Sequence, residues 1–287
     1  MQGNSINCTT LQHSNEMCGK AKVWCSKNKI GQRRNTLYLL AIASIFMLLL
    51  RPDNLSAAIG GEMGASSGVF SVSPTEKVCF AQGNLLYQAS TNTWRFAKHQ
   101  YDCNIKGWIE HYSWGKGSTI TNMEDSNFID WGKNKITNGG NNQWRTLTIE
   151  EWQYVIDQRT TSSGIRFAKA KVKGVNGLIL LPDDWKASTF NLKNTNQAET
   201  GYSNVINVSQ WNVLESAGAV FLPCTGYFDD EFGIVNRNNY GYYWSASTEE
   251  DDFYDAYSIF FGDSEINTGN YFYRYLGYPV RLVCPAQ

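Results

Sequence analysis

The sequence predicts an α+β fold with two helices and many short, mostly antiparallel strands. Aromatic residues make up 14% of the chain and charged residues only 18%, and both features favour β-rich globular structure. Short segments of alternating apolar and polar residues recur between Gly, Asn and Pro, as expected for strands joined by turns. Two other segments show the three-and-four spacing of amphipathic helices. No internal repeat divides the chain, so we expect one folded domain.

The folded domain is expected to begin with short strands. Residues 68–88 alternate apolar and polar side chains, with turns at Pro74 and Gly83. Residues 91–98 predict another strand. Residues 102–142 are rich in Gly, Asn, Ser and Trp without a clear period, so we expect long, ordered loops there.

The first helix is expected within residues 146–159. Thr148 can cap its amino terminus, and Glu151, three residues later, completes a capping box. Apolar residues at helical spacing then form one face, which we expect to be buried. This face consists of Ile149, Trp152, Val155 and Ile156.

The second helix is expected at residues 208–219, with Ser209 as its cap and Trp211, Leu214 and Ala217 on its buried face. The remaining elements are predicted to be strands. Two strands around a turn at residues 174–177 lie between the helices, at residues 165–172 and 176–185. Four follow the second helix, at residues 220–228, 240–247, 256–263 and 279–284.

The first 58 residues differ in charge from the rest of the chain. They hold seven Lys or Arg against two acids, whereas the remainder has 18 basic and 24 acidic residues. An uncharged run at residues 36–50 follows the basic leader, and small residues follow it up to Ala58. This run is short for a bilayer core of about 30 Å but suits a signal peptide. We expect residues 1–58 to be a signal peptide with a basic leader, or an uncleaved N-terminal anchor.

The chain is therefore expected to be exported, to the cell surface, the outer membrane or the extracellular space. Residues 59–68 are rich in Gly, Ala and Ser, and we expect a flexible lead-in there before the domain at residues 69–287. The acidic domain argues against a nucleic-acid partner. Contact with a membrane is expected only through the N-terminal segment, if that segment is not cleaved.

Four of the seven cysteines fall in the expected domain: Cys79, Cys103, Cys224 and Cys284. In an oxidising compartment they allow three disulfide pairings, and the sequence does not rank them. The alternative is that they are small buried hydrophobic residues. Their spacing is not that of a zinc site.

Motifs of catalysis and cofactor binding are missing, and no cofactor is expected. The densest carboxylates lie in TEEDD, residues 248–252. Adjacent acids are usually a solvated surface, but Glu249, Asp251 or Asp252 could also bind calcium. His99 and His111 are expected to have surface or hydrogen-bonded structural roles.

The tyrosines are concentrated near the C-terminus. Nine of the sixteen lie between Tyr240 and Tyr278, interleaved with Asp, Glu, Asn and Ser. Alternation predicts that Trp244, Ile259 and Phe261 point inward. The remaining Tyr, Phe and small polar residues resemble the composition of an antibody paratope. The alternative is a tyrosine-rich core.

We therefore expect a ligand-binding face within residues 249–275. Tyr271, Tyr273 and Tyr275 are expected to share one side of it, because alternate strand residues point the same way. The expected binding residues are Asp251, Asp252, Phe253, Tyr254, Asp263, Glu265, Asn267, Asn270, Tyr271, Phe272, Tyr273 and Tyr275.

Six blocks of sequence, over residues 68–287, resemble a family of exported bacterial proteins. That family is related to the Fibrobacter major paralogous domain and to the variable proteins of diversity-generating retroelements. The blocks are GVFSVSPTEKVCFAQGNLLYQASTNTWRFA, NQWRTLTIEEWQYVIDQR, AKVKGVNGLILLPDDW, ESAGAVFLPCTGYF, YGYYWSAS and PVRLVCPAQ. The resemblance implies a C-type-lectin-like fold of the formylglycine-generating-enzyme branch.

In such proteins, ligand-binding residues are displayed between the YYWS and VRLV strands. The resemblance thus implies that residues 242–245 and 280–282 are scaffold and residues 249–275 the display. The paired active-site cysteines of the related enzymes cannot be placed on Cys224 and Cys284, and the calcium motifs of sugar-binding lectins are absent.

The leading hypothesis is a non-enzymatic recognition domain that binds a protein or a glycan. One alternative is a formylglycine-generating-type oxidase or a decayed relative. The other is a structural surface or fimbrial component, which would need an exposed strand edge for assembly. The sequence gives no obvious edge of that kind.

Export predicts cleavage after Ala57 or Ala58. N-terminal sequencing of the protein recovered from cells should give a chain that begins at residue 58 or 59. Intact chain embedded in the membrane would indicate an anchor, and intact chain in the cytosol would refute export.

Overall fold

The computed structural model describes residues 63–115, 128–249 and 254–287. These residues form a mixed α+β structure with mostly antiparallel strands and two short α-helices, as the sequence predicts. The expected signal segment lies outside the described residues. No helix in the described part of the chain is long and apolar enough to cross a membrane.

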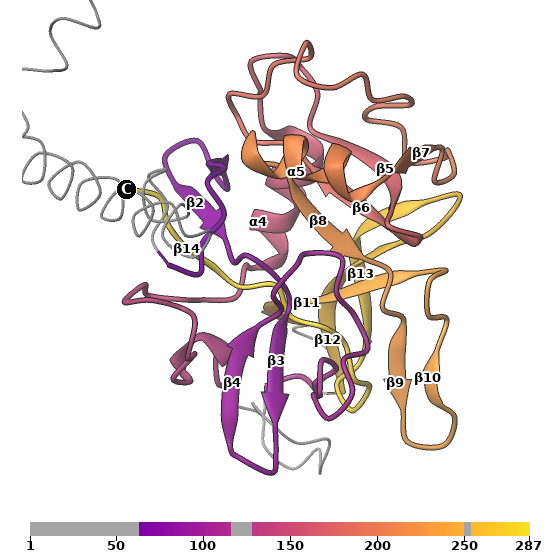
Figure 1. Ribbon diagram of the computed structural model, residues 1–287. Coiled ribbons are helices and arrows are strands. Elements are labelled where there is room, and N and C mark those ends of the chain that lie inside the picture. The colour runs from indigo at the N-terminus through magenta and orange to yellow at the C-terminus, as the bar shows by residue number, and fades with distance from the viewer. Residues whose placement is uncertain (1–62, 116–127, 250–253) are drawn as a thin grey trace, which may run out of the picture. The chain divides into compact units, whose positions relative to one another are not determined.

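The first and last strands of the domain lie in one sheet. β2 (Lys77–Phe80) is its central strand, flanked by β1 (Phe70–Ser71) and β14 (Val283–Pro285) in antiparallel pairing. β3 (Leu85–Gln88) and β4 (Thr93–Phe96) form a separate hairpin. Figure 1 shows β14 beside β2, although the two strands come from opposite ends of the domain.

A four-stranded sheet has the order β7-β5-β6-β8. Lys173 and Gly174 form the turn between β5 and β6, with φ of 50° and 84°. A two-residue turn with both φ positive matches the twist of a β-hairpin, so the turn is shorter than the expected 174–177. The strands are β5 (Phe167–Val172), β6 (Val175–Leu180), β7 (Asn204–Ile206) and β8 (Val220–Pro223).

The second hairpin is formed by β9 (Tyr227–Asp229) and β10 (Gly233–Val235). After it, β11 (Gly241–Thr248), β12 (Asp255–Phe261) and β13 (Ile266–Tyr273) form an antiparallel sheet in sequence order. β13 is a strand that the hydrophobic pattern did not predict. Polar residues and Gly269 interrupt its alternation, and its pairing with β12 shifts register between Ser258 and Phe260.

The first helix forms as expected, and its cap is confirmed. α4 (Ile149–Gln153) begins with a capping box between Thr148 and Glu151. The chain continues as a π-helical turn, η2 (Tyr154–Gln158), and ends with a hydrogen bond of 2.8 Å from the Arg159 N–H to the Tyr154 carbonyl. The four apolar residues of the predicted face are all buried.

The cap expected for the second helix is wrong. α5 (Val208–Ser216) begins at the expected residue, but its cap is Asn207, two residues before Ser209. The Asn207 side chain accepts a hydrogen bond of 2.9 Å from the Gln210 N–H, and the Gln210 side chain accepts one from the Asn207 N–H. Asn caps a helix as well as Ser does. Gln210, three residues after Asn207, completes a capping box there, so Asn207 takes the place expected for Ser209. Trp211 on this helix is fully buried, as predicted.

Three hydrophobic cores hold these elements together. The first core packs α4 against β2, β6, β8, β11 and β12, and includes Ile259 and Phe261. The second core lies among β3, β4, β11 and the C-terminal segment, and includes Trp244. The third core packs α5 on the four-stranded sheet, around Trp211. The predicted inward positions of Trp244, Ile259 and Phe261 are confirmed. Trp244 packs in the second core on one face of the sheet, and Ile259 and Phe261 pack in the first core on the other face.

The expected lead-in contacts the first sheet within the described residues. The Ser66 N–H donates a hydrogen bond of 2.7 Å to the Phe80 carbonyl, and Ala65 forms an isolated bridge with Ala81. Residues 64, 66 and 68 are buried. The packed structure therefore includes part of the segment expected to be flexible.

Glu110 and His111 are neighbouring ionisable residues inside the protein. The Glu110 Oε1 atom accepts a hydrogen bond of 2.7 Å from the Asn104 N–H, and His111 bonds to backbone atoms of Thr225 and Gly226. His111 thus has the structural role that the sequence predicts. Burial raises the pKa of Glu110 to about 7 and lowers the pKa of His111 to about 4.

The raised pKa of Glu110 predicts a pH-dependent effect of Glu110→Gln. Unfolded Glu110 loses its proton near pH 4.5 and folded Glu110 near pH 7, so its contribution to stability falls as the pH rises between these values. The variant has no ionisable group at this position and therefore lacks this pH-dependent contribution. His111 is present in both proteins, so its contribution largely cancels in the comparison. Relative to wild type, the variant should gain roughly 2–3 kcal/mol of unfolding free energy from pH 4.5 to 7.

Urea unfolding at several pH values measures this difference. A difference between variant and wild type that stays constant with pH would contradict the buried, protonated state of Glu110.

Candidate functional site

β13 is the outer strand of its sheet and carries five of the twelve expected binding residues. Its central residues pair with β12, with Tyr271 opposite Tyr257 and Asn270 opposite Ser258. β12 in turn pairs with β11, which is buried between the first and second cores. β13 is therefore attached to a strand that is itself fixed on both faces.

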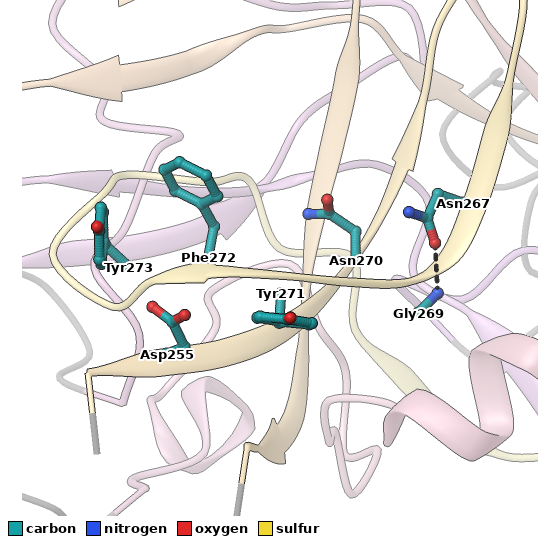
Figure 2. A pocket seen from close by; sticks show the side chains of 7 residues that line it. All are labelled: Asp255, Asn267, Gly269, Asn270, Tyr271, Phe272 and Tyr273. Atoms are coloured by element: carbon teal, nitrogen blue, oxygen red, sulfur yellow. Dashed lines mark hydrogen bonds between the residues drawn. The ribbon is translucent and has the colours of Figure 1, made fainter. Parts of the chain in front are cut away.

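Side chains of β13 alternate between the two faces of the sheet. Asn270 and Phe272 project to one side and Tyr271 to the other (Figure 2). The Tyr271 ring meets the Tyr257 ring edge-on, with centroids 5.8 Å apart. Tyr273 lies opposite Asp255 in the register, but its ring meets the Phe272 ring and lies on the Phe272 side. The expectation that Tyr271 and Tyr273 share one side is therefore wrong, because the regular alternation ends at the last residue of the strand.

Five aromatic side chains at this end of the sheet are exposed. Their exposed fractions range from 38% for Tyr275 to 54% for Tyr254. Tyr273 stacks on Tyr275 with ring centroids 5.3 Å apart, and Phe272 meets Tyr273 edge-on at 5.0 Å. We call this group the aromatic face; it consists of Tyr254, Tyr271, Phe272, Tyr273 and Tyr275. The expected exposure of Tyr271, Tyr273 and Tyr275 is confirmed.

The outer edge of β13 is open beside Tyr271. The Arg274 N–H donates to the Tyr254 carbonyl at 2.8 Å, and hydrogen-bonded pairs alternate with non-bonded pairs in an antiparallel ladder. The N–H and C=O of Tyr271 therefore point away from β12. Within the described residues no hydrogen bond to either group occurs.

The other half of the same edge is covered by the first helix. The Gln153 side chain donates a hydrogen bond of 3.3 Å to the Thr268 carbonyl, and the Thr268 hydroxyl donates one of 2.6 Å to the Asp157 carboxylate. The open edge is thus confined to the aromatic end of the strand. The sequence did not predict this exposed strand edge.

Two pockets lie along β13. The larger, of about 410 Å³, is lined by consecutive residues of the strand and by Asp255. The smaller, of about 210 Å³, is lined mainly by aromatic residues, among them Tyr227 and Tyr242. Asn270 and Phe272 line both. A ligand that contacts these two residues could therefore reach either pocket.

The polar groups in the larger pocket are held in place by hydrogen bonds. The Asn267 Oδ1 atom accepts a bond of 2.9 Å from the Gly269 N–H (Figure 2). The Asn270 Nδ2 atom donates one of 2.9 Å to the Ser258 hydroxyl. Each amide group is fixed by one bond and keeps further hydrogen-bonding capacity for a ligand.

The electrostatic environment of the aromatic face is acidic. The pKa of the Tyr275 phenol is raised, first by burial and then by neighbours that include Asp229, Asp230 and Asp255. The pKa of the Tyr257 phenol is raised to about 12, first because its hydroxyl bonds to the Glu249 carboxylate. Both phenols therefore remain neutral hydrogen-bonding groups at physiological pH.

The structure brings together only part of the expected site. Asn267, Asn270, Tyr271, Phe272 and Tyr273 line one pocket. Tyr254 and Tyr275 belong to the adjoining aromatic face.

The other expected residues lie elsewhere. Asp263 and Glu265 are exposed in the turn between β12 and β13, at the far end of the strand from Tyr273. Asp251, Asp252 and Phe253 lie outside the described residues.

Asp255 lines the larger pocket but was not predicted as a binding residue. Its position at the start of β12, opposite Tyr273, follows only from the register of the sheet. The pairing partner of residue 273 could not be deduced without recognising β13 as a strand.

The cysteines that an oxidase would need lie in different hydrophobic cores. Cys224 belongs to the first core and Cys284 to the second. The Cys224 thiol bonds to the Tyr202 hydroxyl at 3.0 Å, and burial raises its pKa to about 12. Neither cysteine lines the two pockets described above.

Within the described residues no cluster of acidic, His and Cys side chains is placed to hold a metal ion. Of the three acids considered for calcium, Glu249 is bonded to Tyr257, and Asp251 and Asp252 lie outside the described residues. We expect millimolar calcium to change the melting temperature of chelator-treated protein little or not at all, because no cluster of ligands forms around Glu249 among the described residues. A rise that grows with calcium concentration, as mass action requires, would indicate a site.

No protein-family model, curated protein or solved structure matches this chain. A function must therefore be argued from the residues of the aromatic face and from the two pockets beside it.

Proposed function

We propose that this protein is an exported, non-enzymatic recognition protein that binds a protein or a glycan through its aromatic face. The observation that carries the proposal is the grouping of five exposed aromatic side chains at one end of one sheet. Exposed aromatic groups of this size usually mark a binding surface. Tyr and Phe supply a large contact area at a small loss of side-chain entropy.

The scaffold beneath this face supports the proposal. β11 and β12 are packed on both sides by buried residues, including Trp244 and Ile259. A ligand would therefore meet side chains that are already held in place, which lowers the entropic cost of binding. The N–H and C=O of Tyr271 add a pair of backbone groups that an extended peptide could bond.

The proposed fold is C-type-lectin-like, as the sequence resemblance implies. Its support is the mixture of two short helices with small antiparallel sheets, and the sheet that joins the first and last strands. A non-enzymatic role is favoured by the chemistry of the pockets. Their linings consist of Tyr, Phe, Asn, Gly and Leu with one carboxylate, Asp255, and this set offers no activated nucleophile.

Probing glycan, peptide and protein arrays with the purified protein tests the proposal. The variant Tyr271→Ala/Tyr273→Ala/Tyr275→Ala should keep the melting temperature within a few degrees of wild type, because all three side chains are exposed. It should lose binding to whatever ligand the arrays reveal. Truncation of a central aromatic typically costs about 2 kcal/mol or more of binding free energy.

The matched control is Val205→Ala/Val213→Ala, which truncates exposed apolar residues on β7 and α5. It should bind like wild type. If the tyrosine variant binds equally well, or if it unfolds while its folded fraction still binds, the aromatic face is not the binding site.

A further inference from the structure

Two cysteines lie opposite each other on the strands that begin and end the domain. Cys79 on β2 is the direct partner of Cys284 on β14 in an antiparallel ladder. Directly opposed residues point to the same face of a sheet, with Cα atoms about 4.5–5.5 Å apart. A disulfide bridges Cα atoms about 4.4–6.8 Å apart. The Ala81 N–H bonds to the Leu282 carbonyl and the Ala286 N–H to the Lys77 carbonyl, so the two cysteines form a hydrogen-bonded pair of the ladder. The Cα spacing of such a pair, about 5.5 Å, lies within the range for a disulfide.

The packing of the neighbouring residues supports the same orientation. Cys284 lies in the second core, and Cys79 packs against that core. Val78, Phe80 and Val283, which flank the cysteines along the two strands, lie in the first core. Both sulfur atoms are thus on one side of the sheet, and the flanking side chains are on the other.

The other two cysteines of the described residues have no such partner across a strand. Cys103 lies in a loop after β4, and Cys224 follows β8. Of the three pairings that four cysteines allow, the register therefore favours the one that contains the pair Cys79–Cys284.

We propose that Cys79 and Cys284 form a disulfide bond in the presence of a small-molecule disulfide oxidant, and that this bond locks the last strand of the domain to β2. The inference concerns a covalent site and does not depend on the proposed ligand.

The reaction is a thiol–disulfide exchange in two steps. Cys79 is half-buried and Cys284 is buried, so Cys79 is the first to meet oxidised glutathione. Its thiolate attacks one glutathione sulfur, and one glutathione thiolate leaves. The Cys284 thiolate then attacks the Cys79 sulfur, and the second glutathione leaves. The two cysteines lose one proton each, and two electrons reduce the oxidant.

The bond should stabilise the folded protein. It closes a loop of about 200 residues, and cross-links of long loops restrict the unfolded chain most. For a chain of this size we expect the melting temperature to rise by about 5–15 °C. Burial raises the pKa of the Cys79 thiol, so the exchange should become faster as the pH is raised.

Peptide mapping tests the proposal on the full-length protein. The reduced protein is incubated with oxidised glutathione, alkylated and digested with trypsin, and its melting temperature is measured in parallel. Each domain cysteine falls in a different tryptic peptide, so the pairing can be determined directly. The peptides are 78–95 for Cys79, 99–106 for Cys103, 194–237 for Cys224 and 282–287 for Cys284.

We expect a cross-link between peptides 78–95 and 282–287 and a higher melting temperature. Cys79→Ala and Cys284→Ala should each abolish both effects, and the matched control Cys103→Ala should keep both. The proposal is overturned if folded wild-type protein gives no such cross-link, or if Cys79 pairs with another cysteine or with a second chain. A cross-link without a rise in melting temperature would contradict the locking of the strand.

Discussion

The buried guanidinium of Arg281 holds together parts of the chain that are far apart in sequence. It donates to the Asn84 side chain at 3.0 Å and to the Ala81 carbonyl at 3.1 Å. It also donates to the Gln100 side chain at 3.2 Å and to the Phe221 carbonyl at 2.7 Å. Burial lowers its pKa to about 10, so it remains charged at neutral pH, and a buried charge is tolerated only when its donors are bonded. The arginine thereby joins the C-terminal segment to three distant parts of the chain.

The residues just before Arg281 are also bonded to the rest of the domain, up to the aromatic face. The Val280 carbonyl accepts a hydrogen bond of 3.0 Å from the Leu85 N–H, and Tyr278 exchanges two backbone bonds with Tyr112. Tyr278 also stacks on Trp244 at 4.2 Å. The chain thus leaves the aromatic face at Tyr275 and is fixed three residues later. Substitutions in the aromatic face should therefore disturb few contacts of the core.

The sequence predicts the elements whose signals are local. The capping box of Thr148 and Glu151, the apolar face that includes Trp152, and the inward positions of β12 all follow from spacing within a few residues. The bounds and the pairing of β13 could not be predicted because its pairing with β12 is a long-range interaction and its own alternation is weak. For the same reason the sequence revealed the exposed tyrosines but neither Asp255 nor the open edge, since both depend on the register of the sheet. The opposition of Cys79 and Cys284 also appears only when the two ends of the domain are paired.

β13 is a firmly held strand whose aromatic end has an open edge. Amide hydrogen exchange measured by NMR distinguishes these two properties, because each N–H along the strand is observed separately. We expect slow exchange for Phe272, whose N–H faces β12, and for Ile259 in the first core, with fast exchange for Tyr271. Equal protection of Tyr271 and Phe272 would show that the edge is covered. Equally fast exchange of both would show that the strand is not held, and either result would refute this description of β13.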